Sequence, residues 1–383
     1  MKIAVITNSR IPSLTANSIQ AMKVTQALMQ LGHEIRMFAP RETESVSRES
    51  LAAHYGIRLV PDLELLPSER HFKRFDFIFH AQRAAKKFGA DLIYTWLPQS
   101  AVTGLWAGYP VVLEMHGDVS GTMGAWWLRQ FGNARGTKVM TVTTSALRIA
   151  LERSTKIQFK DDSVLIAPNG VELEKYADLP NPPEARHQLN LPESLTVGFT
   201  GHIYPGRGAE LLFELAKQMP QVNFLWVGGT PELVELWRGK LSEANMTNVT
   251  MTGFVKHERI ALYQAASDVL LMPYSRTIEA SSGQDIAEVI NPMKMFEYMA
   301  SGRAIVSADL PSIREVLNEG NAVFVEAVEK GNWESGVGNW RKGIESLLAD
   351  ESRRRELGTQ ARNDVEQLTW VKREERVMKK FPA

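Results

Sequence analysis

The chain has 383 residues, of which 44% are apolar, so it is long enough and apolar enough for two hydrophobic cores rather than one. Its 44 basic and 44 acidic residues cancel, and this balance gives no reason to expect a nucleic-acid partner. Cysteine is absent, which excludes disulfides, thiolate metal sites and cysteine nucleophiles and fits a reducing, cytoplasmic setting. The N-terminal apolar run is too short for a signal peptide, and there is no run of about 18 apolar residues that would span a bilayer. Peripheral contact with the inner face of a membrane stays open.

The first half of the chain alternates strand-like and helix-like segments. A strand at 2–7, a helix at 18–31 and a second strand ending at Phe38 are typical of a βαβ opening. Short continuous apolar runs follow, which predict strands buried on both faces of a parallel sheet, at 90–96, 110–115 and 138–143.

Four prolines interrupt this periodicity and favour a linker over 173–194. The alternation then resumes, with strands expected at 195–200, 223–227, 249–253, 269–272 and 304–307 and helices at 210–218 and 259–266. We therefore predict an α/β fold of two doubly wound, Rossmann-like domains, residues 1–172 and 195–365, that face each other across a cleft. A last helix within 366–383 is expected to pack back toward the N-terminal domain.

The segment 291–302 predicts a short helix that binds an anion. Asn291 suits the capping position, Pro292 the first turn and Gly302 the left-handed exit. Lys294 lies in the first turn, where a cation is disfavoured by the helix dipole, so we expect a phosphate nearby. Glu297 shares the face of Lys294 and could bind the diol of a sugar. A plain surface Lys-Glu pair is the alternative.

Residues 201–208 form a glycine-rich turn between a strand and a helix. Gly201 and Gly208 would let backbone amides approach an anion, and His202 and Arg207 could add positive charge, which suits a diphosphate. The turn lacks the third glycine of a dinucleotide fingerprint and is not a P-loop. An ordinary loop with a surface arginine is the alternative.

Further candidates also follow predicted strands, where the ligands of such sheets bind. His116 follows the strand at 110–115 and could bind a sugar, although a lone histidine is more often structural. Glu288 and Asp285 could accept hydrogen bonds from sugar hydroxyls, or could lie in a solvated acidic loop. Trp126, in the Trp126-Trp127 pair, could stack on a sugar or a lipid, but such pairs are most often core.

Residues 70–88 interleave six basic residues with aromatic and aliphatic ones. The pattern allows a helix that touches anionic lipid. It also allows a domain helix whose aromatic stripe packs inward, and we prefer this interpretation. The sequence has no Asp-x-Asp pair, no His-Glu-x-x-His and no Gly-x-Ser-x-Gly, so a metal or nucleophilic hydrolase has no support.

Taken in order, these motifs resemble the family 4 retaining glycosyltransferases of the GT-B fold over nearly the whole chain. The motifs that carry the resemblance are the N-terminal strand and helix, 91–96, His116-Gly117, 168–171, 201–208, 253–255, 272–274 and 297–302. The resemblance implies that the C-terminal domain binds a nucleotide sugar, UDP-linked above all, and that the N-terminal domain binds a hydroxyl acceptor such as a glycan or glycolipid. It implies transfer with retention of anomeric configuration in glycan or polysaccharide synthesis, with no metal and no other cofactor.

The resemblance also assigns roles to residues. Arg207 would hold the diphosphate, Glu297 the ribose, and the backbone near Met293 and Lys294 the distal phosphate, and Asn291 would also bind the donor. The roles of the remaining residues are to meet the base (Phe254 and Val255), to lie near the donor sugar (His116) and to bind the acceptor (Asn17, Asp118 and Trp126).

Three positions depart from the family pattern. His202 stands where arginine is usual, and Val289 where a first glutamate contacts the donor sugar, so Glu288 or Asp285 would have to supply that contact. Residues 13–18 lack the usual paired glycines. Two other functions therefore remain: a nucleotide-sugar epimerase of similar fold, and a non-catalytic subunit that binds carbohydrate or nucleotide.

Overall fold

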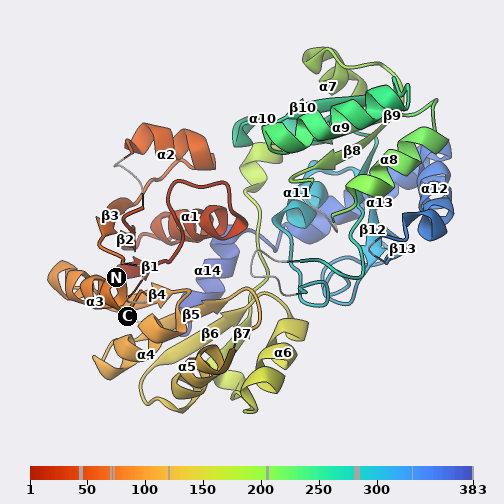
Figure 1. The fold of residues 1–383 in the computed structure, drawn as a ribbon. Coiled ribbons are helices and arrows are strands. Elements are labelled where there is room, and N and C mark those ends of the chain that lie inside the picture. The colour runs from red at the N-terminus through yellow and green to blue at the C-terminus, as the bar shows by residue number, and fades with distance from the viewer. Residues whose placement is uncertain are drawn as a thin grey trace. The chain divides into compact units, whose positions relative to one another are not determined.

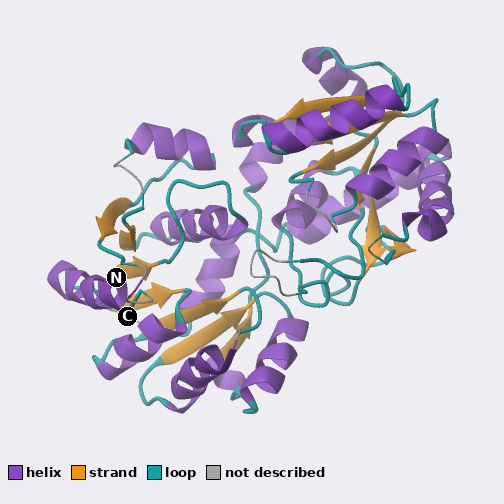
Figure 2. Cartoon of the chain, viewed as in Figure 1, coloured by secondary structure: helices purple, strands orange, loops and turns teal. Residues whose placement is uncertain are grey.

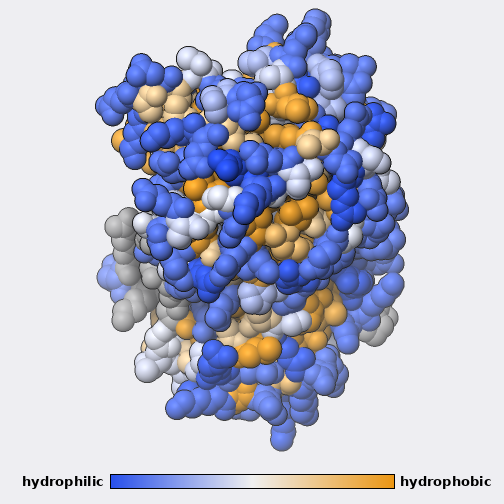
Figure 3. Space-filling view, turned by 90° about the vertical axis from the view of Figure 1, so that its right-hand side faces the viewer, coloured by the Kyte–Doolittle hydropathy of each residue, from blue (hydrophilic) through white to orange (hydrophobic). Residues whose placement is uncertain are grey.

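The computed structural model describes residues 1–42, 46–69, 71, 74–119, 121–203, 207–279, 285–329 and 331–381. The chain divides into two compact units: Met1–Asn169 with Trp370–Ala383, and Gly170–Thr369. Helices and strands alternate along both (Figures 1 and 2). On the face seen in Figure 3, hydrophilic residues cover most of the surface and hydrophobic ones show in separate patches.

The first unit is built on a seven-stranded parallel sheet in the order β3-β2-β1-β4-β5-β6-β7. Its strands are β1 Lys2–Ile6, β2 Glu34–Pro40, β3 Asp62–Leu66, β4 Leu92–Thr95, β5 Val111–Met115, β6 Lys138–Val142 and β7 Val164–Ile166. Its helices are α1 Ala16–Gln30, α2 Arg48–Tyr55, α3 Phe75–Phe88, α4 Pro98–Trp106, α5 Gly121–Asn133, α6 Ser145–Thr155 and α14 Trp370–Met378. Every residue of β4 and β5 is buried, as the continuous apolar runs predicted.

Helices α3, α4, α5 and α6 pack successively on one another, whereas α1 packs with α2 and α14 (Figure 1). The C-terminal helix α14 therefore belongs to the first unit, although the chain reaches it through the second.

The second unit is built on a six-stranded parallel sheet in the order β10-β9-β8-β11-β12-β13. Its strands are β8 Thr196–Thr200, β9 Asn223–Val227, β10 Val249–Gly253, β11 Val269–Met272, β12 Ala304–Asp309 and β13 Val323–Glu326. Its helices are α7 Pro182–Leu189, α8 Ala209–Gln218, α9 Pro231–Glu243, α10 His257–Ala265, α11 Met293–Ser301, α12 Trp333–Ala349 and α13 Glu351–Val365. The predicted α/β class, with two Rossmann-like halves, is confirmed.

The segment expected as a linker, 173–194, is instead part of the second unit. Pro182 and Pro183 lie in the first turn of α7, where a missing N–H leaves no hydrogen bond unmade, and Asn181 and Glu184 form a capping box. Arg186 of α7 is buried and donates to Asp268 at 2.8 Å, which ties the helix to the second unit. Two of the four prolines that suggested the linker therefore lie at the start of a helix.

Candidate functional site

Two glycines shape the loop between β8 and α8 at the carboxyl end of β8. Gly201 follows the strand at φ +124° and donates its N–H to the Val227 carbonyl at 2.8 Å. Gly208 is the N-cap of α8 at φ +91°, and a Cβ there would lie 2.3 Å from the Pro273 carbonyl oxygen. The loop therefore runs closer to the end of β11 than a side chain would allow. Residues 204–206 lie outside the described residues.

Helix α11 forms where 291–302 predicted it, with a different cap. Gly302 takes the left-handed exit at φ +65°, as expected. The N-cap, however, is Pro292 and not Asn291, so no side chain caps the first turn and the helix begins at Met293. The proposed capping role of Asn291 is wrong because the helix starts one residue later than the pattern indicated. Among the described residues, the N-cap of α11 therefore gives the first amides of the helix no side-chain hydrogen bond.

Lys294 lies in this first turn, and its amine is buried. Nζ lies 3.8 Å from the centroid of the Phe199 ring and 5.7 Å from that of the Tyr274 ring. It has no hydrogen-bond partner among the described residues. A Cβ at Gly201 would lie 3.0 Å from Nζ, so this glycine makes room for the amine. The alternative of a solvated surface lysine does not describe this geometry.

The charges around Lys294 favour the binding of an anion. Burial, with the neighbouring Arg207 guanidinium, holds the pKa of Lys294 well below its usual range, and Glu297 only partly opposes this. Burial also raises the pKa of Tyr274 to about 12, against the opposing charge of Arg207. The Arg207 guanidinium and the Lys294 amine thus lie near each other at the end of β8, close to the start of two helices. An anion between them would relieve their repulsion and bind to free backbone amides.

Glu297 lies one turn further along α11. It accepts a hydrogen bond from Gln264 of α10 at 3.4 Å. Its charge contributes to the raised pKa of Tyr176, after the larger effect of burial. The hydroxyl of Tyr298 accepts from the Thr200 amide at 2.8 Å, which fixes α11 against the last residue of β8. The structure therefore brings Gly201, Arg207, Lys294 and Glu297 together.

The other predicted donor residues belong to the same unit. His202 follows Gly201 and is partly buried. Phe254 follows β10 with 56% of its surface exposed. Val255 packs against a small buried cluster that consists of Ala185, Leu225, Val227, Ala265 and Ala266. Glu288 is exposed. Asp285 accepts from the amides of Ile278 and Ala287, so it organises its own loop.

In the first unit, His116 directly follows β5 and keeps 19% of its side chain exposed. Its Nε2 lies 2.6 Å from Oε1 of Glu114, a buried residue of β5. The three candidates for acceptor binding belong to the same unit. Asp118 accepts from the Ser154 hydroxyl at 2.6 Å, Asn17 is exposed at the start of α1, and Trp126 is 40% exposed on α5. The expected convergence of His116 with the donor residues in one cleft stays a prediction.

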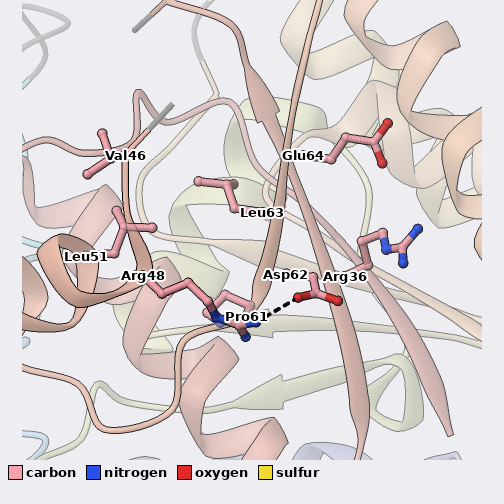
Figure 4. Close-up of a pocket in the computed structure, with 8 residues that line it drawn as sticks. All are labelled: Arg36, Val46, Arg48, Leu51, Pro61, Asp62, Leu63 and Glu64. Atoms are coloured by element: carbon pink, nitrogen blue, oxygen red, sulfur yellow. Dashed lines mark hydrogen bonds and ion pairs between the residues drawn. The ribbon is translucent and has the colours of Figure 1, made fainter. Parts of the chain in front are cut away.

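A surface pocket of about 410 Å³ lies elsewhere, at β2 and β3 (Figure 4). It is lined by Arg36, Val46, Arg48, Leu51, Pro61, Asp62, Leu63 and Glu64, with an ion pair between Arg48 and Asp62 at 3.2 Å. Asp62 is the first residue of β3. Ligands of parallel sheets bind at the opposite, carboxyl edge, so we assign the pocket no part in the site.

Within the described ranges, no cluster of three His, Asp or Glu side chains could hold a metal ion. Nor does any described helix have the length and apolarity needed to cross a bilayer.

Sequence reasoning missed the partners of the candidate residues. Phe199 and Tyr274 surround the Lys294 amine, and Gln264 binds Glu297. Glu114 had a usable signal, because it is a carboxylate inside a strand with an otherwise apolar sequence, and a buried charge requires a partner. The partner, Arg373, is 259 residues away and no pattern in the sequence connects the two.

Comparison with known proteins places both units in one enzyme family. Residues 18–175 match the model described as Glycosyltransferase Family 4, and residues 194–349 the model described as Glycosyl transferases group 1.

Two relatives and one solved structure illustrate this placement. A putative teichuronic acid biosynthesis glycosyltransferase, TuaH of Bacillus subtilis, is 29% identical over 177 residues, or 45% of this chain but only 41% of that protein. The D-inositol 3-phosphate glycosyltransferase of Xylanimonas cellulosilytica is 24% identical over 392 residues, which span 92% of this chain and 88% of that one. Anabaena Alr3699/HepE, solved in complex with UDP, has a TM-score of 0.75 at 17% identity over 99% of both chains. The chain belongs to the family 4 glycosyltransferases of the GT-B fold.

Proposed function

We propose that this chain transfers a sugar from a nucleoside diphosphate sugar, UDP-linked above all, to a hydroxyl acceptor with retention of anomeric configuration. The observation that carries the proposal is the buried Lys294 amine, which has no hydrogen-bond partner among the described residues and lies beside Arg207. A diphosphate supplies the anion that this geometry calls for. The HepE structures contain UDP and UDP-glucose, which favours the same class of donor here.

In the proposed reaction, negative charge builds on the leaving diphosphate as the glycosidic bond breaks. Arg207, Lys294 and the uncapped amides of α11 stabilise that charge, so the step needs no divalent metal. Glu297 accepts hydrogen bonds from the ribose diol of the nucleotide. The leaving phosphate helps to deprotonate the acceptor hydroxyl, as the family resemblance implies, and His116 of the first unit binds the donor sugar.

The variant Arg207→Ala tests this assignment. Removing one charge-stabilising donor is expected to cost about 2 to 4 kcal/mol in the transition state, which lowers kcat by roughly 30-fold to 900-fold. The measurement is UDP release from a panel of UDP-sugars, with and without acceptor and with and without EDTA. The control is Arg238→Ala, a change in the same unit at a side chain that binds the Met251 carbonyl. Unchanged kinetics in Arg207→Ala would show that this side chain does not hold the diphosphate.

The same assay separates the alternative functions. An epimerase would convert the donor with no acceptor present. A non-catalytic subunit would bind UDP, raising the melting temperature by mass action, yet turn over no donor. Val289 is the observation that favours this last alternative, because it is only 8% exposed and places an apolar side chain where the family has a carboxylate.

We further propose that the first unit contacts anionic membranes through an aromatic surface. Aromatic rings of α3, α4 and α5 gather there around the buried Trp127: the rings of Phe75, Trp106 and Trp126 lie 6.1, 6.2 and 4.7 Å from it. Phe79 lies one turn from Phe75 and is 59% exposed. The aromatic surface comprises Phe75, Phe79, Trp106, Met123 and Trp126.

This surface corrects the expectation for residues 70–88 and indicates the kind of partner that it contacts. The aromatic stripe of 70–88 packs inward only in part: Phe77, Ile78 and Phe88 are buried, Phe75 and Phe79 are exposed, and Arg70, Phe72 and Lys73 lie outside the described residues. The three helices contain the basic residues Arg83, Lys86, Lys87 and Arg129 against the single acidic residue Asp76. Exposed aromatic rings beside uncompensated basic residues favour the headgroup region of an anionic bilayer.

Cosedimentation with lipid vesicles tests this contact. The chain is expected to bind vesicles of phosphatidylglycerol with phosphatidylcholine, to bind phosphatidylcholine alone weakly, and to dissociate with salt. The double variant Phe79→Ser with Trp106→Ser should lose the binding, whereas Leu236→Ser, which removes an equally exposed apolar side chain from the second unit, should keep it. Self-association through this surface without vesicle binding would contradict the proposal.

A further inference from the structure

A buried polar network surrounds Glu114, the neighbour of His116. Oε1 of Glu114 lies 2.6 Å from Nε2 of His116 and 2.6 Å from Nη2 of Arg373. Gln20 and Tyr94 also donate to this carboxylate. Glu114, Arg373, Gln20 and Tyr94 are each no more than 1% exposed, so the network is closed to water.

The ionisation state of Glu114 decides which nitrogen of His116 carries a proton. Burial opposes ionisation, but Arg373 and His116 outweigh it and lower the pKa of Glu114 to about 2. A carboxylate can only accept hydrogen bonds, so Nε2 of His116 must be the donor. The contact therefore fixes the orientation of the ring and places a proton on Nε2. Nδ1 takes no part in this contact.

Arg373 holds this carboxylate from the far end of the chain. It lies on α14, four residues after the second unit ends at Thr369. Its Nε also donates to the carbonyl of Pro168 at 3.0 Å, one residue before the first unit ends at Asn169. Arg373 thus connects the segment by which the chain re-enters the first unit to the segment by which it leaves. The same guanidinium contacts Glu114, which in turn contacts His116.

Stability alone does not account for such a network. Buried ion pairs are often no more stabilising than apolar side chains of similar size, because removing charges from water is costly. An apolar pair on β5 and α14 would close the same core, yet it could not orient an imidazole. This comparison favours a role in holding His116.

We propose that Glu114 is a positioning residue for the transfer reaction: it orients His116 and sets its tautomer, and Arg373 of the C-terminal helix holds Glu114 in place. The inference rests on the proposed function only in assigning His116 to the reaction. The orientation of the ring can be tested without it.

The decisive variant is Glu114→Met with Arg373→Met, which removes both charges of this pair together. Arg373 also pairs with the buried Glu374, whose pKa burial raises to about 7, so that this carboxyl can lose its charge by taking up a proton. We expect it to fold, with kcat at least tenfold lower and the KM for donor changed less than kcat. His116→Ala should lower kcat to a similar degree. The triple variant should be no slower than His116→Ala alone, because Glu114 acts through His116. Asp268→Asn, which breaks a buried ion pair in the second unit, is the matched control. It should have the wild-type kcat at temperatures below its melting temperature.

The inference is overturned if the losses of kcat in His116→Ala and in the double variant multiply in the triple variant. It is also overturned if the folded double variant keeps the wild-type kcat. Nitrogen-15 NMR of the His116 ring gives a second readout that needs no activity. The wild type is expected to show one tautomer protonated at Nε2, and the double variant a mixture. A wild-type ring protonated at Nδ1 alone overturns the inference even if the chain transfers sugar. The expected tautomer in a chain that transfers none leaves the positioning intact and contradicts only the proposed function.

Discussion

At the scale of single residues, Lys294 shows what a sequence can and cannot indicate. A lysine in the first turn of a helix conflicts with the helix dipole, so its position alone predicted a nearby anion. The aromatic rings of Phe199 and Tyr274 that bury the amine come from other strands and loops, and only the fold brings them there. The sequence therefore singled out the charged group, and the structure adds that its amine is buried.

Replacing Lys294 should separate stability from ligand binding. Lys294→Met removes a buried amine that lacks a hydrogen-bond partner, so we expect about 1 kcal/mol of added stability and a melting temperature about 2 to 4 °C higher. UDP affinity should fall at least tenfold in calorimetry. Lys217→Met, an exposed change on α8, should alter neither quantity. A variant that is less stable and binds UDP normally would contradict this account of the lysine.

The lowered pKa of Lys294 predicts proton uptake on binding. Between that lowered pKa and the usual 10.5, the unfolded chain binds a proton that the folded chain lacks, so stability rises with pH across this window. UDP favours the protonated amine, which raises its pKa again. Binding within the window should therefore take up as much as one proton per UDP. Calorimetry in buffers of different ionisation enthalpy measures this uptake, and it should vanish in Lys294→Met. Proton release instead would show that the sign is wrong.

At the scale of elements, most buried strands could be predicted, and β9, β10 and β11 occupy the predicted ranges. Their continuous apolar runs reflect burial on both faces. The edge strands β3, β7 and β13 were missed, because they are only partly buried and their apolar signal is weak, although the edge strand β10 was predicted. Helix α7 was missed because its prolines, which permit a first turn, also resemble a linker.

Two glycines at helix ends offer a contrast that tests the loop at β8. Gly302→Ala adds a Cβ with no atom nearer than 3.9 Å, so we expect only the cost of the left-handed backbone, about 1 to 2 kcal/mol. Gly208→Ala adds the same strain and a clash with Pro273, so it should be the more destabilising change and should also weaken UDP binding. Denaturant unfolding measures both. Equal losses of stability would mean that the loop does not approach β11 as closely as described.

At the scale of the whole molecule, the chain crosses between its units twice, and the C-terminal helix returns to the first unit. The two-domain order could be predicted from repeated strand and helix patterns. The joining of β5 to α14 by Glu114 and Arg373 could not, because it depends on a contact between residues far apart in the sequence. Family membership sets the reaction class, whereas the donor, the acceptor and the roles of individual side chains stay predictions.

A crystal structure of the chain with UDP tests the central claim most directly. The account predicts that the diphosphate lies at the carboxyl end of β8, with Lys294 Nζ and the Arg207 guanidinium within hydrogen-bonding distance of its oxygens and Glu297 on the ribose. UDP bound away from β8 and α11, or bound there with Nζ still making no hydrogen bond, would contradict it.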